Sequence, residues 1–226
     1  YSDISKFITS RRGKDKIIVV RGGVDATPSN QYLNSNNLVP LSSRKYDACF
    51  VGRLHYQKGT LELTRIWKLV CNKIPRARLA IIGTGPLASE IKDEIKRQGL
   101  CENIDILGLK FGEEKHEIFK QSKIVVHPAT YDSGGMASAE AMAWGLPGVA
   151  FDLEALKTYY PEGMLKTQRF NLNEFAHNIL LLLTDHNTYE VLSQKAARLI
   201  REQWDWEKRA EEIFNYIDKN NMREHA

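Results

Sequence analysis

The sequence predicts an α/β fold, in which a doubly wound, Rossmann-like parallel sheet of about six strands is followed by extra C-terminal helices. Two observations support this prediction. Short apolar runs alternate with helical patterns through most of the chain, as expected when helical crossovers join parallel strands. After Pro161 the pattern becomes helical and stays so to the end of the chain.

The individual elements follow from the spacing of apolar residues. Short apolar runs predict strands at Ile17–Val20, Ala48–Val51, Leu79–Ile82, Ile104–Leu107, Ile124–His127 and Gly148–Phe151. Helical spacing between these runs predicts helices at about Thr60–Cys71, Leu87–Gln98, Glu113–Gln121 and Met136–Trp144. The C-terminal part adds helices at Asn171–Thr184, Asn187–Glu202 and Trp206–Asn220.

The same patterns divide the chain into three parts. Residues 1–15 do not fit the sheet and are expected to be the tail of an interdomain segment. Residues 16–203 are expected to form the Rossmann-like domain, and residues 204–226 a C-terminal helix. Because the chain begins with Tyr1 and not with Met, we expect it to be a piece of a longer protein.

Composition excludes several classes of function. The hydrophobic fraction of 42% and the charged fraction of 27% are those of an ordinary globular protein. The net charge is only +4 and no recognition motif accompanies it, so nucleic acid is not expected as a partner. No apolar run approaches the ~20 residues that span a bilayer, and no signal-peptide pattern stands at the start. Cys49, Cys71 and Cys101 lack metal-binding spacing and predict reduced thiols in a cytoplasmic protein.

Residues 127–152 carry the strongest functional signal. They predict a strand end, a loop with Gly134 and Gly135, and the start of a helix, where free backbone N–H groups and a partial positive charge suit phosphate. Asp132 precedes the loop and Glu140 follows eight residues later. Carboxylates are not expected beside a phosphate unless they bind another part of the ligand, and the hydroxyl groups of a sugar are good candidates for that part. The segment therefore indicates a nucleotide-sugar site, although the small residues of this helix could merely pack on a sheet.

A second segment, residues 51–59, adds two cations. A strand that ends at Gly52 delivers Arg53 to the carboxyl edge of the sheet, where open α/β folds bind ligands, and Lys58 follows before a helix. Taken alone, Arg53 could be an ordinary exposed residue.

A third segment has Gly83 and Gly85 in a tight turn after a strand, and a turn with a purely structural role would use the same residues. It is no dehydrogenase fingerprint, because the third glycine is missing.

These motifs resemble those of the retaining group 1 glycosyltransferases with the GT-B fold. That family has Glu-Gly-Phe-Gly-(Leu)-x-x-x-Glu-Ala-Met-Ala-x-Gly-x-Pro, in which the first acid is Asp132 here and the Phe position is Gly134. It also has Gly-Arg-Leu…Lys-Gly, as at residues 52–59, and an Asn-Gly-Val-Asp turn that resembles residues 22–25. The matching residues of the first motif are Gly135, Glu140, Ala141, Met142, Ala143, Gly145 and Pro147.

The resemblance implies transfer of a hexose from a nucleoside diphosphate sugar, with Asp132 facing sugar hydroxyls, Glu140 the ribose, and Arg53 and Lys58 the diphosphate. No metal and no cofactor would be needed. His127 is expected to be structural or to line the substrate. The donor-binding positions would be Gly52, Gly83, Gly85, Leu109, Gly134, Gly135, Met136 and Ala137.

The resemblance also implies what lies outside this chain. Residues 16–203 would be the C-terminal, donor-binding domain, and the last helix would cross back to an absent N-terminal domain that binds most of the acceptor. This acceptor would be a lipid-linked sugar or a glycan, at the inner face of the membrane in the first case. The chain alone is expected to be inactive. The alternatives are a non-catalytic nucleotide-sugar-binding module, or an epimerase or phosphorylase of GT-B architecture.

Overall fold

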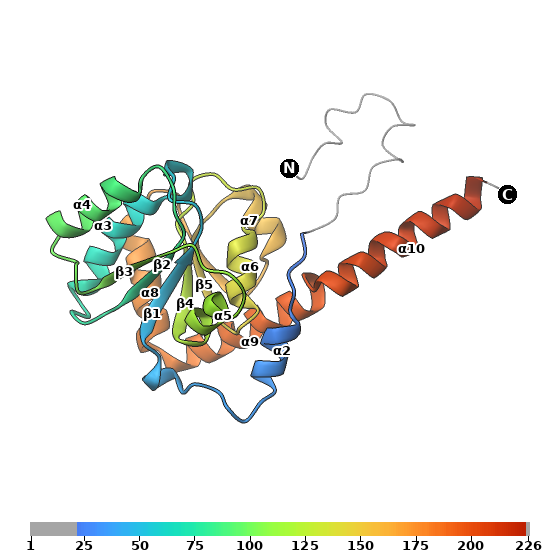
Figure 1. Ribbon diagram of the computed structural model, residues 1–226, viewed down its shortest axis with the longest axis horizontal. Helices are drawn as coiled ribbons and strands as arrows, with labels where there is room; N and C mark the ends of the chain where they lie inside the picture. The colour runs from blue at the N-terminus through green and yellow to red at the C-terminus, as the bar shows by residue number, and fades with distance from the viewer. Residues whose placement is uncertain (1–21, 225–226) are drawn as a thin grey trace.

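Six parallel strands form the centre of the domain (Figure 1). The computed structural model describes residues 22–224, with side chains as far as residue 218. The strands stand in the order β3-β2-β1-β4-β5-β6, which confirms the predicted doubly wound parallel sheet. They are β1 (Tyr46–Val51), β2 (Leu79–Ile82), β3 (Ile104–Gly108), β4 (Ser122–His127), β5 (Gly148–Phe151) and β6 (Met164–Thr167).

Helices cover both faces of this sheet. One face packs on α3 (Thr60–Cys71), α4 (Ala88–Arg97) and α8 (Leu172–Thr184). The other packs on α5 (Gly112–Lys120), α6 (Met136–Met142), α7 (Glu154–Tyr159) and α9 (His186–Gln203). Because both faces are covered, the strands can be apolar throughout, and every residue of β2 and β5 is buried.

Three elements differ from the sequence-based expectation. The prediction of helix alone after Pro161 was wrong, because β6 pairs there with β5 in parallel. The short helices α7 and α2 (Thr27–Leu33) were not predicted. The sixth strand is therefore β6, whereas the predicted strand Ile17–Val20 and the predicted interdomain tail at residues 1–15 lie outside the described residues.

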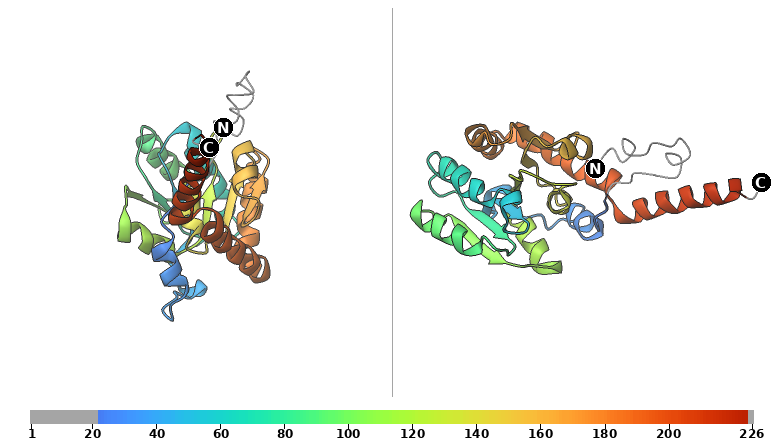
Figure 2. Two further views of the ribbon diagram at one scale, coloured as in Figure 1. Left: turned by 90° about the vertical axis from the view of Figure 1, so that its right-hand side faces the viewer. Right: turned by 90° about the horizontal axis from the view of Figure 1, so that it is seen from above.

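The last helix, α10 (Trp206–Glu224), leaves the domain and extends away from it (Figures 1 and 2). Its start is fixed beside the first described residues, since the N–H of Val24 donates to the carbonyl of Trp204 and the N–H of Trp206 donates to the carbonyl of Val24, at 2.8 and 3.0 Å. Trp206, Phe214 and Ile217 are exposed on this helix. They line a mainly apolar cavity of about 520 Å³ together with Gly22 and Gly23.

Candidate functional site

The candidate site lies at the carboxyl ends of β1 and β4, where the strand order reverses. Chain connections leave β1 and β4 in opposite directions along the sheet, and open α/β folds bind ligands at such a point. The two loops touch, because the N–H of Thr130 donates to the carbonyl of Gln57 at 2.9 Å. Gly59 has a φ of 64°, and a Cβ there would lie 1.8 Å from the carbonyl oxygen of Pro128. Glycine at this position therefore lets the loops meet.

This contact brings Lys58 and Asp132 together. Nζ of Lys58 lies 2.5 Å from Oδ2 of Asp132, and Nε2 of His127 lies 3.1 Å from the same oxygen. The ring N–H of His127 is not aligned for a hydrogen bond, so we treat this as a close electrostatic contact. Oδ1 of Asp132 accepts the N–H groups of Gly134 and Gly135 at 3.1 and 2.9 Å. The side chain of Asp132 is only 8% exposed.

The cluster keeps Asp132 ionised. Burial by itself raises the pKa of this carboxyl, but the contact with His127 and the hydrogen bonds from Lys58 and Gly135 outweigh burial and hold the pKa far below its ordinary value. At neutral pH, Asp132 is therefore a fixed negative charge and has no proton to give.

Arg53 stands apart from this cluster. It follows the end of β1 and is exposed, and it makes no hydrogen bond or ion pair with any of residues 22–218. The next residue, Leu54, is fully buried, and its N–H donates to the carbonyl of Thr84 at 2.9 Å. The loop is thus anchored beside an arginine whose guanidinium is available to a ligand.

Gly83 and Gly85 have a packing role that is visible in the structure. A Cβ on Gly83 would lie 1.9 Å from the carbonyl oxygen of Gly52, and one on Gly85 would lie 2.4 Å from that of Leu54. The two glycines let the loops after β1 and β2 pack together. Their predicted contact with a nucleotide stays a prediction, as does that of Leu109, which is exposed with Phe111 in the loop after β3.

Glu140 has a partner that the sequence did not reveal. It lies on α6, and Nζ of Lys115 on α5 is 2.9 Å from its Oε2. The side chain of Lys115 is 18% exposed and that of Glu140 is 37% exposed. Lys115 stands in the first turn of α5, just after the loop that contains the expected donor-binding position Leu109, and this place in the sequence is the signal that could have indicated it.

Tyr160 anchors the loop that contains Gly134 and Gly135. Its single hydroxyl proton is shared between the carbonyls of Gly134 and Gly135, at 3.1 and 2.7 Å, and its buried ring stacks on Trp204. Of the four N–H groups expected to face phosphate, those of Gly134 and Gly135 are already bound by Asp132. Those of Met136 and Ala137 have no partner within the described part of the chain.

Two further features concern metal binding and membrane insertion. Between residues 22 and 224, no group of three or more His, Cys, Asp or Glu side chains is arranged to hold a metal ion. In the same range, no helix combines the length and apolarity required to cross a membrane.

The sequence matches a family model described as group 1 glycosyl transferases over residues 37–199. The poly(glycerol-phosphate) alpha-glucosyltransferase of Bacillus subtilis (strain 168) is 26% identical over 161 residues, which are 70% of this chain and 24% of that protein. The chain spans about half or less of the lengths of the curated relatives with which it was compared.

Solved structures share the fold. A mutant of TarM from S. aureus, in complex with fondaparinux, alpha-GlcNAc-glycerol and UDP, matches 89% of this chain and 44% of its own length with a TM-score of 0.70 and 22% identity. HepE from Anabaena, in complex with UDP and glucose, matches 89% of this chain and 57% of its own length with a TM-score of 0.74 and 18% identity. Since the family model covers well over half of the sequence, this chain belongs to the group 1 glycosyltransferases.

Proposed function

We propose that this chain is the donor-binding domain of a retaining glycosyltransferase, which transfers a hexose from a nucleoside diphosphate sugar to an acceptor. The observation that carries the proposal is the arrangement at the switch point, where a free Arg53 and the fixed Lys58 follow β1 and the glycine loop follows β4. TarM and HepE have UDP in their structures, which supports a nucleotide-sugar donor for a chain of the same fold.

Arg53 and Lys58 would bind the diphosphate. Breaking the anomeric bond leaves a nucleoside diphosphate, and negative charge builds on its distal phosphate. Cations at that phosphate favour the transition state over the ground state. We propose that these two side chains make a divalent metal unnecessary.

Glu140 would bind the ribose, and Lys115 would hold its carboxylate in place. Ribose hydroxyls do not change during transfer, so their binding is equal in the ground and transition states. We therefore expect Glu140→Gln in the full-length enzyme to raise KM for the donor with little change in kcat, and Lys115→Met to do the same more weakly. Steady-state kinetics at varied donor concentration checks this, and a fall in kcat at unchanged KM would contradict the ribose assignment.

The acceptor would bind mainly to an N-terminal domain outside this chain. The apolar, exposed face of α10 suits a helix that packs on a second domain. We propose a lipid-linked sugar or a glycan as acceptor and a cytoplasmic enzyme, which in the lipid-linked case works at the inner face of the membrane. Because the active site would close between two domains, we expect the chain alone to transfer no sugar.

The anomeric configuration of the product tests the proposal. Nuclear magnetic resonance of the product formed by the full-length enzyme from an α-linked nucleotide hexose should show an α-linkage. A β-linked product would contradict the retaining mechanism. An epimerase would convert the donor into an epimer without an acceptor, and a phosphorylase would strictly need free phosphate. A binding module would bind the donor without any reaction.

A further inference from the structure

We propose that the cavity at the carboxyl ends of β5 and β6 is a subsite for a saccharide unit of the acceptor. This inference rests on the proposed function and deepens it, because it assigns part of the acceptor site to this chain. The ligand would be a neutral sugar that covers the ring of Phe170 and bonds to the polar side chains around it.

The lining of this cavity suits a ligand that carries hydroxyl groups. The cavity has a volume of about 600 Å³, within the usual range of small-molecule sites, and its lining is mainly polar. Two carboxylates, two cations and an amide contribute to it, namely Asp152, Glu154, Lys166, Arg169 and Gln168. Lys157 stands beside the lining, with Nζ 3.4 Å from Asp152 and 3.9 Å from Glu154. Because the charges of the lining balance, it offers donors and acceptors together, which suits a sugar hydroxyl better than an anion.

Phe170 adds an exposed aromatic ring to this lining. The residue is 57% exposed and has a φ of 69°, and within the described part of the chain no other residue except glycine has a positive φ. A bulky residue in this backbone conformation is strained, and such strain is concentrated at binding sites. The ring of Phe151 lies beside it, with the centroids 6.1 Å apart. A sugar on the open part of the ring would bury apolar surface that is now in water.

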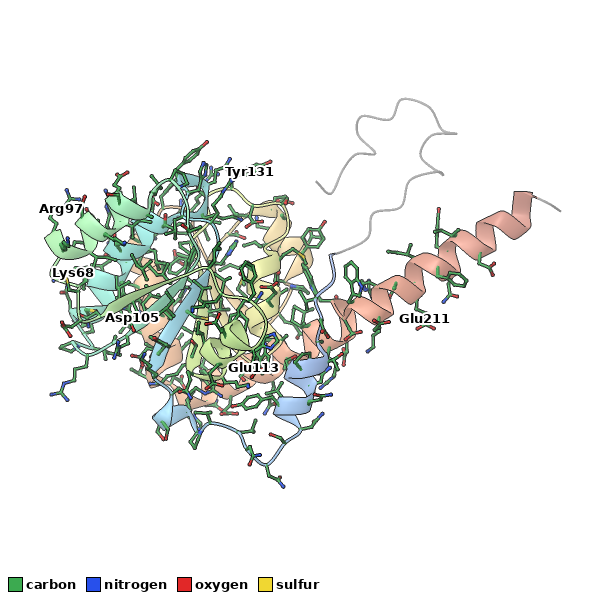
Figure 3. All side chains as sticks on the ribbon, viewed as in Figure 1. Lys68, Arg97, Asp105, Glu113, Tyr131 and Glu211 are labelled. Atoms are coloured by element: carbon green, nitrogen blue, oxygen red, sulfur yellow. The ribbon has the colours of Figure 1, made fainter. Side chains whose placement is uncertain are left out.

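The cavity adjoins the loop that would hold the donor sugar. β5 pairs with β4 and β6 pairs with β5, all in parallel, so the three following loops are neighbours along one edge of the sheet. Nη1 of Arg169 donates to the carbonyl of Thr130 at 3.4 Å, two residues before Asp132. Tyr131, between them, is 61% exposed at the edge of the domain, far from Glu211 on α10 (Figure 3). A saccharide in the cavity would therefore lie next to the donor sugar, as an acceptor must.

Nuclear magnetic resonance titration of the 226-residue chain tests the inference. The probes are the methyl α-glycosides of glucose, galactose, mannose and N-acetylglucosamine. We expect at least one of them to bind in the millimolar range and to shift the backbone amide signals of Asp152, Gln168 and Phe170. Phe170→Leu should weaken this binding about tenfold, because it removes the flat ring, and Phe170→Tyr should retain it.

Phe214→Leu is a matched control, because Phe214 is a 68% exposed phenylalanine on α10, and it should leave the affinity unchanged. If Phe170→Leu does not fold, Gln168→Ala takes its place, since Gln168 is exposed and lines the same cavity. Unchanged binding by the variant used, or shifts confined to the loops after β1 and β4, would overturn the inference. Shifts at the cavity caused by inorganic phosphate and by none of the glycosides would also overturn it, because the cavity would then be an anion site.

Titration with UDP, GDP and ADP separates this inference from the proposed function. If a nucleotide shifts the loops after β1 and β4 but no glycoside binds, the acceptor subsite is wrong and the donor site stands. If a glycoside binds beside Phe170 but none of the nucleotides binds, the proposed function is wrong, and the acceptor role of the cavity is wrong with it.

Discussion

Arg53→Ala in the full-length enzyme is expected to lower kcat by about 10²–10³-fold, comparable to the loss of one donor from an oxyanion hole. Arg53 would face charge that grows in the transition state, so its loss raises the barrier more than it weakens ground-state binding. Steady-state kinetics at saturating donor would measure the effect.

The fold should survive this substitution, because Arg53 is exposed and has no partner among residues 22–218. An unchanged melting temperature is therefore part of the expected result. Arg65→Ala is a suitable control, since Arg65 is an exposed arginine on α3, and it should leave kcat unaltered. An Arg53→Ala enzyme with normal kcat at saturating donor would overturn the assignment of this side chain to the diphosphate.

Gly59→Ala is expected to lower the free energy of unfolding by about 2–4 kcal/mol, because it combines a strained backbone with a steric clash. The methyl group would meet the carbonyl oxygen of Pro128 at 1.8 Å, and Gly59 has a φ of 64°. The loops after β1 and β4 would have to separate, so donor binding should weaken as well. Urea unfolding followed by circular dichroism measures the change in stability.

Gly99→Ala separates the two causes. Gly99 has a φ of 68°, close to that of Gly59, but nothing lies within 4 Å of a Cβ at that position. It should therefore show only the backbone cost, about 1–2 kcal/mol. Equal destabilisation by the two substitutions would mean that the loops can separate freely. The tight contact between Gly59 and Pro128 would then contribute nothing to the free energy of unfolding.

The sheet was largely predictable because β1 to β5 each contain a mostly apolar run, and every residue of the four-residue strands β2 and β5 is buried. β6 was not, because Met164–Thr167 is a four-residue strand with a lysine, and its pairing with β5 is a tertiary interaction. Two of its four residues are only half-buried, so its sequence does not stand out from the helical pattern that follows it.

The candidate site shows the same limit. The family motifs in the sequence predicted that Lys58 and Asp132 belong to one donor site. The sequence could not predict their direct ion pair, the burial of His127 against it, or the link from Glu140 to Lys115. These contacts depend on how loops far apart in sequence pack together, which residue spacing does not encode.

The central claim is that the chain binds a nucleoside diphosphate through protein cations alone. Calorimetric titration of the 226-residue chain with UDP, GDP and ADP in the presence of EDTA tests it most directly. We expect at least one of them to bind, with an affinity that EDTA leaves unchanged and that Arg53→Ala reduces. Binding that EDTA abolishes and Mg²⁺ restores would contradict the metal-independent site, and the absence of binding by all three would contradict the donor-binding function.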